Sequence, residues 1–325
     1  MTLYRRSLVR LAAGAVALPA ISRIAVAQTY PTRPVRILLG FTVGGPSDIL
    51  ARIMGQWLSE RLHQQFVIES RPGAGGNIAT EVVARAPADG YTLLLATSAN
   101  AINATLYDKL NFNFIRDMAP VAGLVRVPQV IEVHPSIPAK TVPEFIAYAK
   151  ANPGKLNMAS AGNGTVHHVA GELFKIMAGV DMQHVPYRGQ SQALIDVLAG
   201  HAQVMFDTVP ASIQYLKNGQ LRPLAVTTAT RAEAFPNLPT VADYLPGYES
   251  SAFYGVAAPR GTPTEIVDAL NREINEALAE PKMGTRLAEL GGSVVAGSSA
   301  DFGRLIADET EKWAKVVRAA NIKPD

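Results

Sequence analysis

The 325-residue chain contains no cysteine, and only 18% of its residues are charged. Without cysteine there is no disulfide framework, no cysteine-ligated zinc and no cysteine nucleophile. Apolar residues are not scarce, since they make up 48% of the chain, and this fraction excludes a mostly disordered protein. The length exceeds that of one ordinary domain and predicts two.

Acidic residues are absent from residues 1–27, which contain four arginines. Subtracting these four from the net charge of +3 leaves −1 for the other 298 residues. The basic balance therefore belongs to the leader, and no nucleic-acid-binding surface is predicted.

The leader has the order of a cleaved export signal. Arg5-Arg6 precedes the apolar run Leu11–Ile21, and Ala25-Val26-Ala27 follows as a small-residue cleavage site. The apolar run is too short for a membrane anchor, which needs about 20 residues. We therefore predict removal of residues 1–27 and a mature protein in the periplasm. The arginine pair matches a twin-arginine signal; a Sec signal with a chance arginine pair is the alternative.

After the leader, strand-like apolar runs alternate with helical patterns, and none is apolar enough to insert the mature chain into a membrane. The first block is a βαβαβ run, which predicts a parallel sheet. Its predicted strands and helices are 35–41, 46–63, 66–69, 77–86 and 91–96. Residues 119–133 are predicted as two short strands broken at Pro128, and a second α/β block runs from 141 to 227.

The strand pattern 251–258 and the three helical patterns after it are too few to form a domain. We therefore expect the chain to cross twice between two α/β lobes. Lobe one is predicted as residues 28–125 plus 250–325, and lobe two as residues 126–249. Two crossings form a hinge, and a hinge between lobes forms a cleft.

Ligands of parallel α/β sheets bind at the carboxyl ends of strands, where free N–H groups of the next helix attract an anion. The first such turn contains Phe41, Gly44, Gly45, Ser47 and Asp48. Its glycines permit close approach of a ligand to the backbone. Asp48 is interpreted chiefly as a carboxylate that opposes the helix dipole, and as a ligand contact if the ligand carries an amine.

The second turn, Arg71–Asn77, offers a run of backbone donors that could hold an anion. It lacks the Gly-Lys-Ser/Thr ending and the G-x-G-x-x-G register, so a nucleotide is not predicted. The alternative is a tight turn that lets a helix pack closely.

The third turn runs from Ser160 to His168 and contains Asn163, Gly164 and Thr165. Asn163 or Thr165 is suited to cap the next helix and also to reach a carboxylate. His167 and His168 are neighbours that point about 100° apart on a helix, so they do not chelate one metal ion. Structural or hydrogen-bonding roles are the main interpretation for both, with ligand contact by His168 as the alternative.

Two further turns follow strands of the second block. Tyr187 is placed to close over a ligand, and Arg188 is either a cationic fork for a carboxylate or a solvated loop residue. Asp207 either binds an amine or a water or fixes the neighbouring loops.

Catalytic motifs are missing. There is no G-x-S-x-G elbow, no H-E-x-x-H and no recognisable pair of glycosidase carboxylates. An exported protein also lacks ready access to ATP and NADH. We therefore predict no catalytic residue, no metal and no cofactor.

Taken together, the motifs resemble the extracytoplasmic solute receptors of tripartite tricarboxylate transporters, also called the Bug family. The resemblance covers residues 30–323, with Gly40, Val43 and Ser70 as departures in the first two turns. The motifs that carry it are 35–48, 69–77, 89–93, 160–168, 184–189, 224–227, 239–241 and 313–317.

The resemblance implies a two-lobed periplasmic-binding-protein fold of the Venus-flytrap type (type II-like), with mixed sheets flanked by helices and a ligand cleft between the lobes. It also implies a monomeric receptor, which captures a small carboxylate and delivers it to membrane permease subunits. The alternatives are an exported α/β hydrolase, with Ser47 or Ser160 as nucleophile, and a ligand-binding sensor for a two-component system. The predicted ligand-binding residues are Phe41, Gly44, Gly45, Ser47, Asp48, Thr97, Ser98, Ser160, Asn163, Gly164, Thr165, His168, Tyr187 and Asp207.

Overall fold

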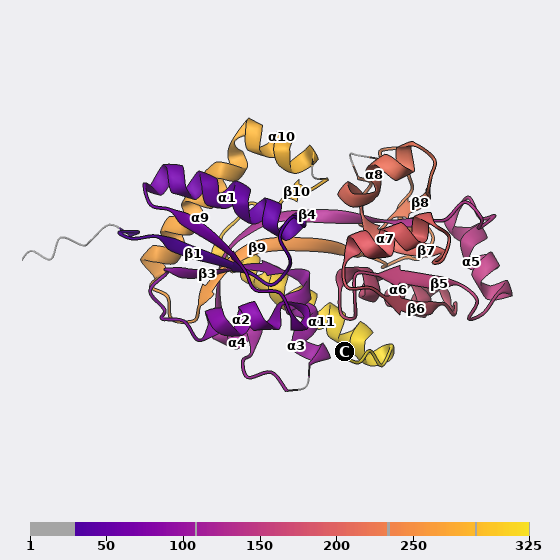
Figure 1. Cartoon of the computed structure of the whole chain (residues 1–325), viewed down its shortest axis with the longest axis horizontal. Coiled ribbons are helices and arrows are strands. Elements are labelled where there is room, and N and C mark those ends of the chain that lie inside the picture. The colour runs from indigo at the N-terminus through magenta and orange to yellow at the C-terminus, as the bar shows by residue number, and fades with distance from the viewer. Residues whose placement is uncertain (1–29, 108, 233–234, 290, 325) are drawn as a thin grey trace, which may run out of the picture.

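The computed structural model describes residues 30–107, 109–232, 235–289 and 291–324, and the predicted export signal, 1–27, lies outside these residues. The chain forms two α/β halves side by side, connected by long strands (Figure 1). Within the described ranges, no helix is both long enough and apolar enough to cross a membrane.

The first half begins with the expected βαβαβ run. Strand β1 pairs in parallel with both β2 and β3, and every residue of β3 is buried, as predicted for a central parallel strand. The elements are β1 (Val35–Leu39), α1 (Pro46–Leu62), β2 (Phe66–Ser70), the short 3-10 helix η1 (Ala74–Gly76), α2 (Asn77–Ala84) and β3 (Thr92–Thr97).

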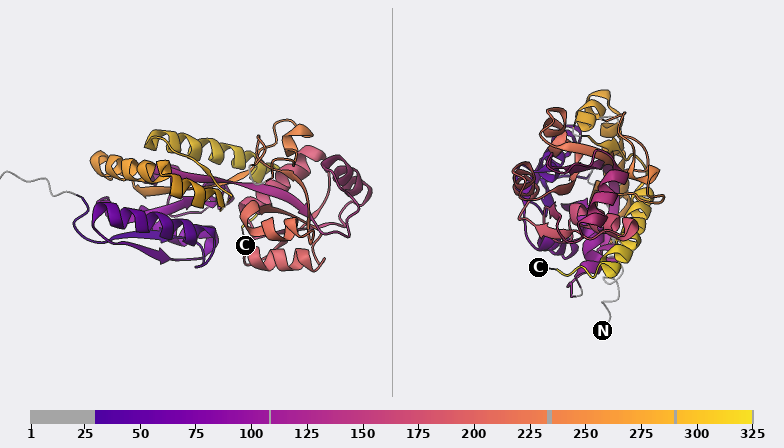
Figure 2. Two further views of the ribbon diagram at one scale, coloured as in Figure 1. Left: turned by 90° about the horizontal axis from the view of Figure 1, so that it is seen from above. Right: turned by 90° about the vertical axis from the view of Figure 1, so that its right-hand side faces the viewer.

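The prediction of two short strands broken at Pro128 is wrong. Strand β4 (Met118–Val133) is continuous and runs from one half into the other (Figures 1 and 2). Pro128 lies where β4 changes partners: it pairs with Ser251 of β9 (Ser251–Pro259), and the next residue, Gln129, pairs with β7. The missing proline N–H is tolerated at this change of neighbours, so the strand does not break.

The second half is a further α/β block. Strand β7 is antiparallel to β4, whereas β5 is parallel to β6 and β7. The elements are α5 (Val142–Ala151), β5 (Asn157–Ser160), α6 (Val166–Ala178), β6 (Gln183–Pro186), α7 (Gln190–Leu198), β7 (Val204–Thr208), α8 (Val209–Lys217), β8 (Arg222–Val226) and the 3-10 helix η2 (Val241–Asp243).

Strand β9 returns the chain to the first half, where it pairs antiparallel with β3 and β4. The final elements are α9 (Thr264–Ala279), α10 (Pro281–Glu289), the short strand β10 (Ser293–Val294) and α11 (Ser299–Ala319). Two helices of the first half, α3 (Ser98–Leu106) and α4 (Phe114–Asp117), were not predicted.

Buried apolar residues form separate clusters in the two halves. One cluster contains Ile37, Leu93 and Trp313, and another contains Phe145 and Phe206. Helix α6 adds Val166 and Val169 to the first cluster, so it connects the two halves. The lobe boundaries given above stay a prediction.

Candidate functional site

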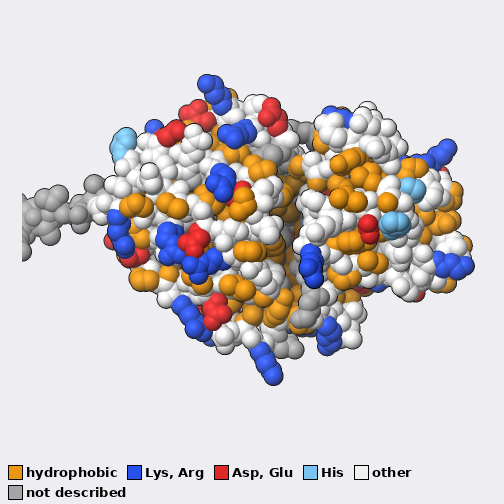
Figure 3. Space-filling model, viewed as in Figure 1, with side chains coloured by type: hydrophobic (Ala, Val, Ile, Leu, Met, Phe, Trp, Pro, Cys, Tyr) orange, Lys and Arg blue, Asp and Glu red, His pale blue; other side chains and the backbone are white. Residues whose placement is uncertain are grey.

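Four helices follow strands that end near the boundary between the halves, two of them after a short turn. Helices α1 and α3 follow β1 and β3 in the first half, and α6 and α8 follow β5 and β7 in the second. Figure 3 shows a groove between the two halves. The free N–H groups of a helix start carry partial positive charge, so such a groove suits an anion.

The second and third turns lie on two sides of Asn103 in α3. Its Nδ2 donates to the Gly75 carbonyl over 2.9 Å, while its Oδ1 lies 3.5 Å from where a Cβ on Gly164 would be. That same Cβ would be only 2.2 Å from Leu106 Cδ2, and Gly164 has a φ of +71°. The absence of a side chain at Gly164 is therefore what allows the third turn to approach α3.

In the first turn, Asp48 holds its own loop. Its carboxylate accepts hydrogen bonds from the Gly44 N–H and from Arg52 Nε, each over 3.0 Å. The Arg52 hydrogen bond is the main cause that lowers the pKa of Asp48. These contacts match the structural interpretation, and a ligand contact by Asp48 stays a prediction. Of the other predicted residues here, Ser47 is buried, Phe41 and Gly45 are half-buried, and Gly44 is exposed.

At the end of β3, Thr97 and Ser98 are buried and take part in local structure. The Thr97 N–H donates to Asn100 Oδ1 over 2.8 Å at the start of α3. Ser98 Oγ accepts from the Phe253 N–H over 2.8 Å and so ties α3 to β9. The structure therefore gives both residues structural roles at the predicted position.

The third turn is closed by its own hydroxyls. Ser160 Oγ accepts from the Gly162 N–H over 3.1 Å and lies 2.6 Å from His184 Nε2. Thr165 Oγ1 donates to the Gly162 carbonyl over 2.7 Å, and Asn163 lies in the same turn.

The adjacent histidines point to different neighbours. His168 accepts from the Gly164 N–H at Nδ1 over 3.3 Å and stacks on His184. His167 instead lies with Nε2 3.4 Å from Asp207 Oδ1. The two rings therefore face different partners, and among the described residues no three His, Asp or Glu side chains gather as metal ligands would.

In the turns that contain Tyr187 and Asp207, an aspartate carboxylate accepts the hydrogen bonds that hold the loop. The Tyr187 hydroxyl donates to Asp196 Oδ2 over 2.7 Å, and burial together with Asp196 raises the Tyr187 pKa to about 12. Arg188 is exposed. Asp207 accepts from Gln190 Nε2 over 2.5 Å and from Ser212 Oγ over 2.7 Å, which matches the interpretation that it fixes neighbouring loops.

Three polar residues beside these turns were not among the predicted ligand-binding residues: Asn77, His184 and Gln190. Asn77 begins α2 directly after Gly75-Gly76, and Gln190 begins α7 directly after Gly189. Their place at a helix start was the available signal. His184 had no such signal, because its contacts with Ser160 and His168 are tertiary.

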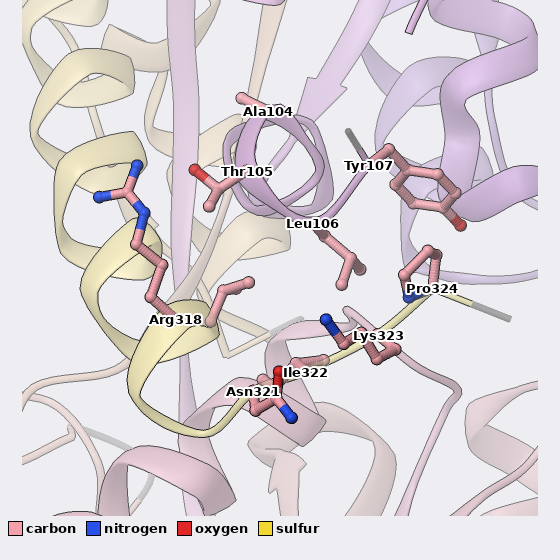
Figure 4. A pocket seen from close by; sticks show the side chains of 10 residues that line it. Ala104, Thr105, Leu106, Tyr107, Arg318, Asn321, Ile322, Lys323 and Pro324 are labelled. Carbon is pink, nitrogen blue, oxygen red and sulfur yellow. The ribbon is translucent and has the colours of Figure 1, made fainter. Parts of the chain in front are cut away.

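The pockets described in the structure lie away from the predicted residues. One, of about 510 Å³, lies between the end of α3 and the C-terminal residues and is lined by Thr105, Tyr107, Arg318 and Lys323, among others (Figure 4). Another, of about 360 Å³, lies beside α11 and is lined by Glu249 and Lys312, among others. These two pockets therefore do not mark the predicted site.

Residues 50–322 match the profile of the tripartite tricarboxylate transporter family receptor. A solved structure of Rpa4515 from R. palustris with adipate is 40% identical, covers 91% of this chain and 100% of its own, and superposes with a TM-score of 0.84.

Two further solved structures agree. MatC (Rpa3494) from Rhodopseudomonas palustris, with bound malate, is 32% identical over 89% of this chain and 100% of its own, with a TM-score of 0.80. The periplasmic binding protein BugD is 30% identical over 91% of this chain and 100% of its own, also with a TM-score of 0.80. The predicted two-lobed periplasmic-binding-protein fold is thereby confirmed.

Proposed function

Because this chain belongs to the tripartite tricarboxylate transporter receptor family, we propose that it captures a small carboxylate in the periplasm and passes it to the membrane subunits of a tripartite transporter. The observation that carries the proposal is the set of helix starts, two from each half, at the boundary between the halves. The adipate and malate in the related structures support a carboxylate as the ligand class.

Capture would rest on main-chain N–H groups and hydroxyls rather than on an unpaired cationic side chain. Asp48 already bonds Arg52, and the turns that follow β1 and β5 present glycines, which let a ligand approach the backbone. A carboxylate between helix starts is stabilised by the partial positive charge of both. Neither a metal nor a cofactor is needed for this mode of binding.

Binding would also favour the closed arrangement of the lobes. The Gly164 turn already packs against Leu106 of α3, so the second half reaches the first beside the proposed site. A ligand that contacts both halves binds the closed form more tightly and shifts the population toward it. The closed form would be what the membrane subunits recognise.

The hydrolase alternative would place its nucleophile at Ser47 or Ser160, and of these Ser160 lies 2.6 Å from His184 Nε2. A general base needs a pKa near the working pH. Burial, followed by the nearby His168, lowers the pKa of His184 to about 3, which makes it a poor base at neutral pH. Ser160 is also fully buried, so we favour a receptor over an enzyme.

The proposal is tested by titration calorimetry of the mature protein against monocarboxylates, dicarboxylates, tricarboxylates, amino acids and sugars. We expect saturable binding of one carboxylate class at one site per chain, with no turnover on long incubation. Removal of the Ser160 hydroxyl in Ser160→Ala should weaken binding by a graded amount, since it also loosens the Gly162 N–H. Binding of sugars alone, or conversion of any acid, would contradict the proposal.

Delivery needs a separate experiment, because a two-component sensor would capture the same ligand. Vesicles that contain the co-encoded membrane subunits should accumulate the labelled carboxylate only when the mature protein is added. Uptake that does not depend on the protein would favour the sensor. Mass spectrometry of the periplasmic fraction would test the cleavage after Ala27.

A further inference from the structure

Buried side-chain nitrogen and oxygen atoms without a hydrogen-bond partner occur on four of the described residues: Asn77, Arg126, Glu132 and His167. Native proteins rarely leave such atoms unpaired, so each needs an explanation. Asn77 and His167 share a position: each lies in the first turn of a helix, α2 or α6, and they come from different halves. On the basis of the proposed function, we propose that Asn77 and His167 are further ligand contacts, which hold polar atoms of the bound carboxylate from the two halves.

Only one of the two polar atoms of the Asn77 side-chain amide is hydrogen-bonded. Its Oδ1 accepts from Asn103 Nδ2 over 3.1 Å, whereas its Nδ2 has no partner, although the residue is only 5% exposed. It follows Gly76, where an added Cβ would lie 3.6 Å from the Phe41 ring, so Asn77 adjoins the first turn. An amide NH2 group only donates, and its missing partner is therefore an acceptor such as a carboxylate oxygen.

His167 is oriented by an acidic side chain. Its Nε2 lies 3.4 Å from Asp207 Oδ1, and neither ring nitrogen has a hydrogen-bond partner, although the residue is only 7% exposed. Asp207 is itself held by Gln190 and Ser212. With Nε2 directed to Asp207, the ring atom left for a ligand is Nδ1.

The neighbouring His168 differs in each respect. Its Nδ1 accepts from the Gly164 N–H, its ring stacks on His184, and its Nε2 lies 3.7 Å from Glu172 Oε1. These contacts occupy the ring from several sides. The structure therefore favours His167 over His168 as the histidine that reaches the ligand.

The two proposed contacts are connected through Asn103 of α3. Asn103 bonds Asn77 on one side, and on the other its Oδ1 lies next to Gly164, three residues before His167. A ligand oxygen near Asn77 and another polar atom near His167 would therefore join the halves next to the contact between Gly164 and helix α3.

Asn77→Asp separates a ligand role from a structural one. The substitution keeps the oxygen that accepts from Asn103, and the partial positive charge of the helix start offsets part of the cost of a buried carboxylate, so the variant is expected to fold. If Asn77 contacts the ligand, binding weakens, because the free donor becomes a charged acceptor that faces a carboxylate. We expect about tenfold to hundredfold weaker binding of the carboxylate found in the calorimetric panel. Asn218→Asp, at the exposed end of α8, is the matched control and should bind normally.

His167→Met gives the corresponding test in the second half. Because the imidazole has no hydrogen bond, replacing it with an apolar side chain of similar volume should leave the thermal unfolding temperature unchanged or higher. Carboxylate binding should nevertheless fall at least tenfold, and His167→Gln, which keeps a polar group, should recover part of it. Exposed His201→Gln is the control.

The outcomes are distinct. If the wild-type protein binds no carboxylate, the proposed function fails and this inference fails with it. If the wild-type protein binds a carboxylate and both variants bind it equally well, only this inference is overturned. If one variant alone loses affinity, the assignment of the other residue is wrong.

Discussion

His168 and His184 stack face to face, with ring centroids 3.5 Å apart and ring planes 9° apart. Burial and the neighbouring His168 lower the pKa of His184 from 6.5 to about 3. In the unfolded chain His184 binds a proton below pH 6.5, whereas the folded chain does not until about pH 3. Stability therefore falls as the pH drops between these values.

We predict that this single group removes about 1.4 kcal/mol of unfolding free energy per pH unit of acidification between pH 6.5 and pH 3. Urea denaturation at a series of pH values would measure the slope. His184→Gln should flatten it, because glutamine does not titrate. Exposed His201→Gln should keep the wild-type slope, and equal slopes for His184→Gln and the wild type would contradict the assignment.

Glu309 in α11 is buried and serves three donors. It accepts from Arg126 Nη2 over 2.5 Å, from Lys312 Nζ over 2.8 Å and from Trp313 Nε1 over 2.7 Å. Glu309→Ala leaves Trp313 Nε1 without an acceptor and leaves Lys312 and Arg126 with Glu249 as their remaining acidic partner. We predict a loss of about 3 kcal/mol of unfolding free energy. Glu311→Ala on the same helix removes only an exposed pair with Lys315 and should cost less than about 1 kcal/mol. Similar losses for the two variants in urea denaturation would refute this explanation.

Gly40 at the end of β1 fixes the distance between the first and second turns. A Cβ there would lie 2.4 Å from Gly76 Cα, a backbone atom that cannot rotate away. Gly40→Ala should therefore push the two turns apart, lower stability by about 1–3 kcal/mol and weaken carboxylate binding. Gly284→Ala in α10 meets no atom within 4 Å and should be neutral or slightly stabilising. Unchanged binding by a folded Gly40→Ala protein would show that the spacing of these turns does not matter.

The strands and most helices were predictable because their signals are local. Continuous apolar runs such as Thr92–Thr97 and glycine-rich turns at helix starts occur wherever a parallel α/β sheet is built. Helix α3 was missed because four of its nine residues are serine, asparagine or threonine, which favour caps and turns, and burial in the folded protein outweighs that preference.

The site was predictable only in part, because many of its contacts join residues that are far apart in the sequence. The turns that contain Ser160 and Asp207 could be located from sequence, but their partners could not. His184, which contacts Ser160, lies 24 residues further along the chain, and Gln190, which contacts Asp207, lies 17 residues before it. Such pairs depend on how helices pack against the sheet, which local patterns do not specify.

Glu132 on β4 is fully buried, and neither of its carboxyl oxygens has a hydrogen-bond partner. It is two residues from Val130, which pairs with Asp207, so Glu132 and Asp207 share one face of the sheet. Burial, with repulsion from Asp207 as a second cause, raises the pKa of Glu132 well above 4.5. Between pH 4.5 and its folded pKa, Glu132 is protonated in the folded chain and ionised in the unfolded chain. The free energy of unfolding is therefore highest below pH 4.5 and falls as the pH rises toward the folded pKa.

Glu132→Gln removes the titration and keeps the size of the side chain. We predict that the unfolding free energy of the variant, relative to that of the wild type, increases by about 1.4 kcal/mol for each pH unit above 4.5, until the folded pKa of Glu132 is reached. Urea denaturation from pH 4 to pH 9 measures the difference. Glu144→Gln, on an exposed side chain at the start of α5, is the control and should show no such rise. A constant difference between Glu132→Gln and the wild type across this range would mean that Glu132 is ionised in the folded protein, with a cation or water as a partner, because only an ionised carboxylate leaves the proton balance of unfolding unchanged.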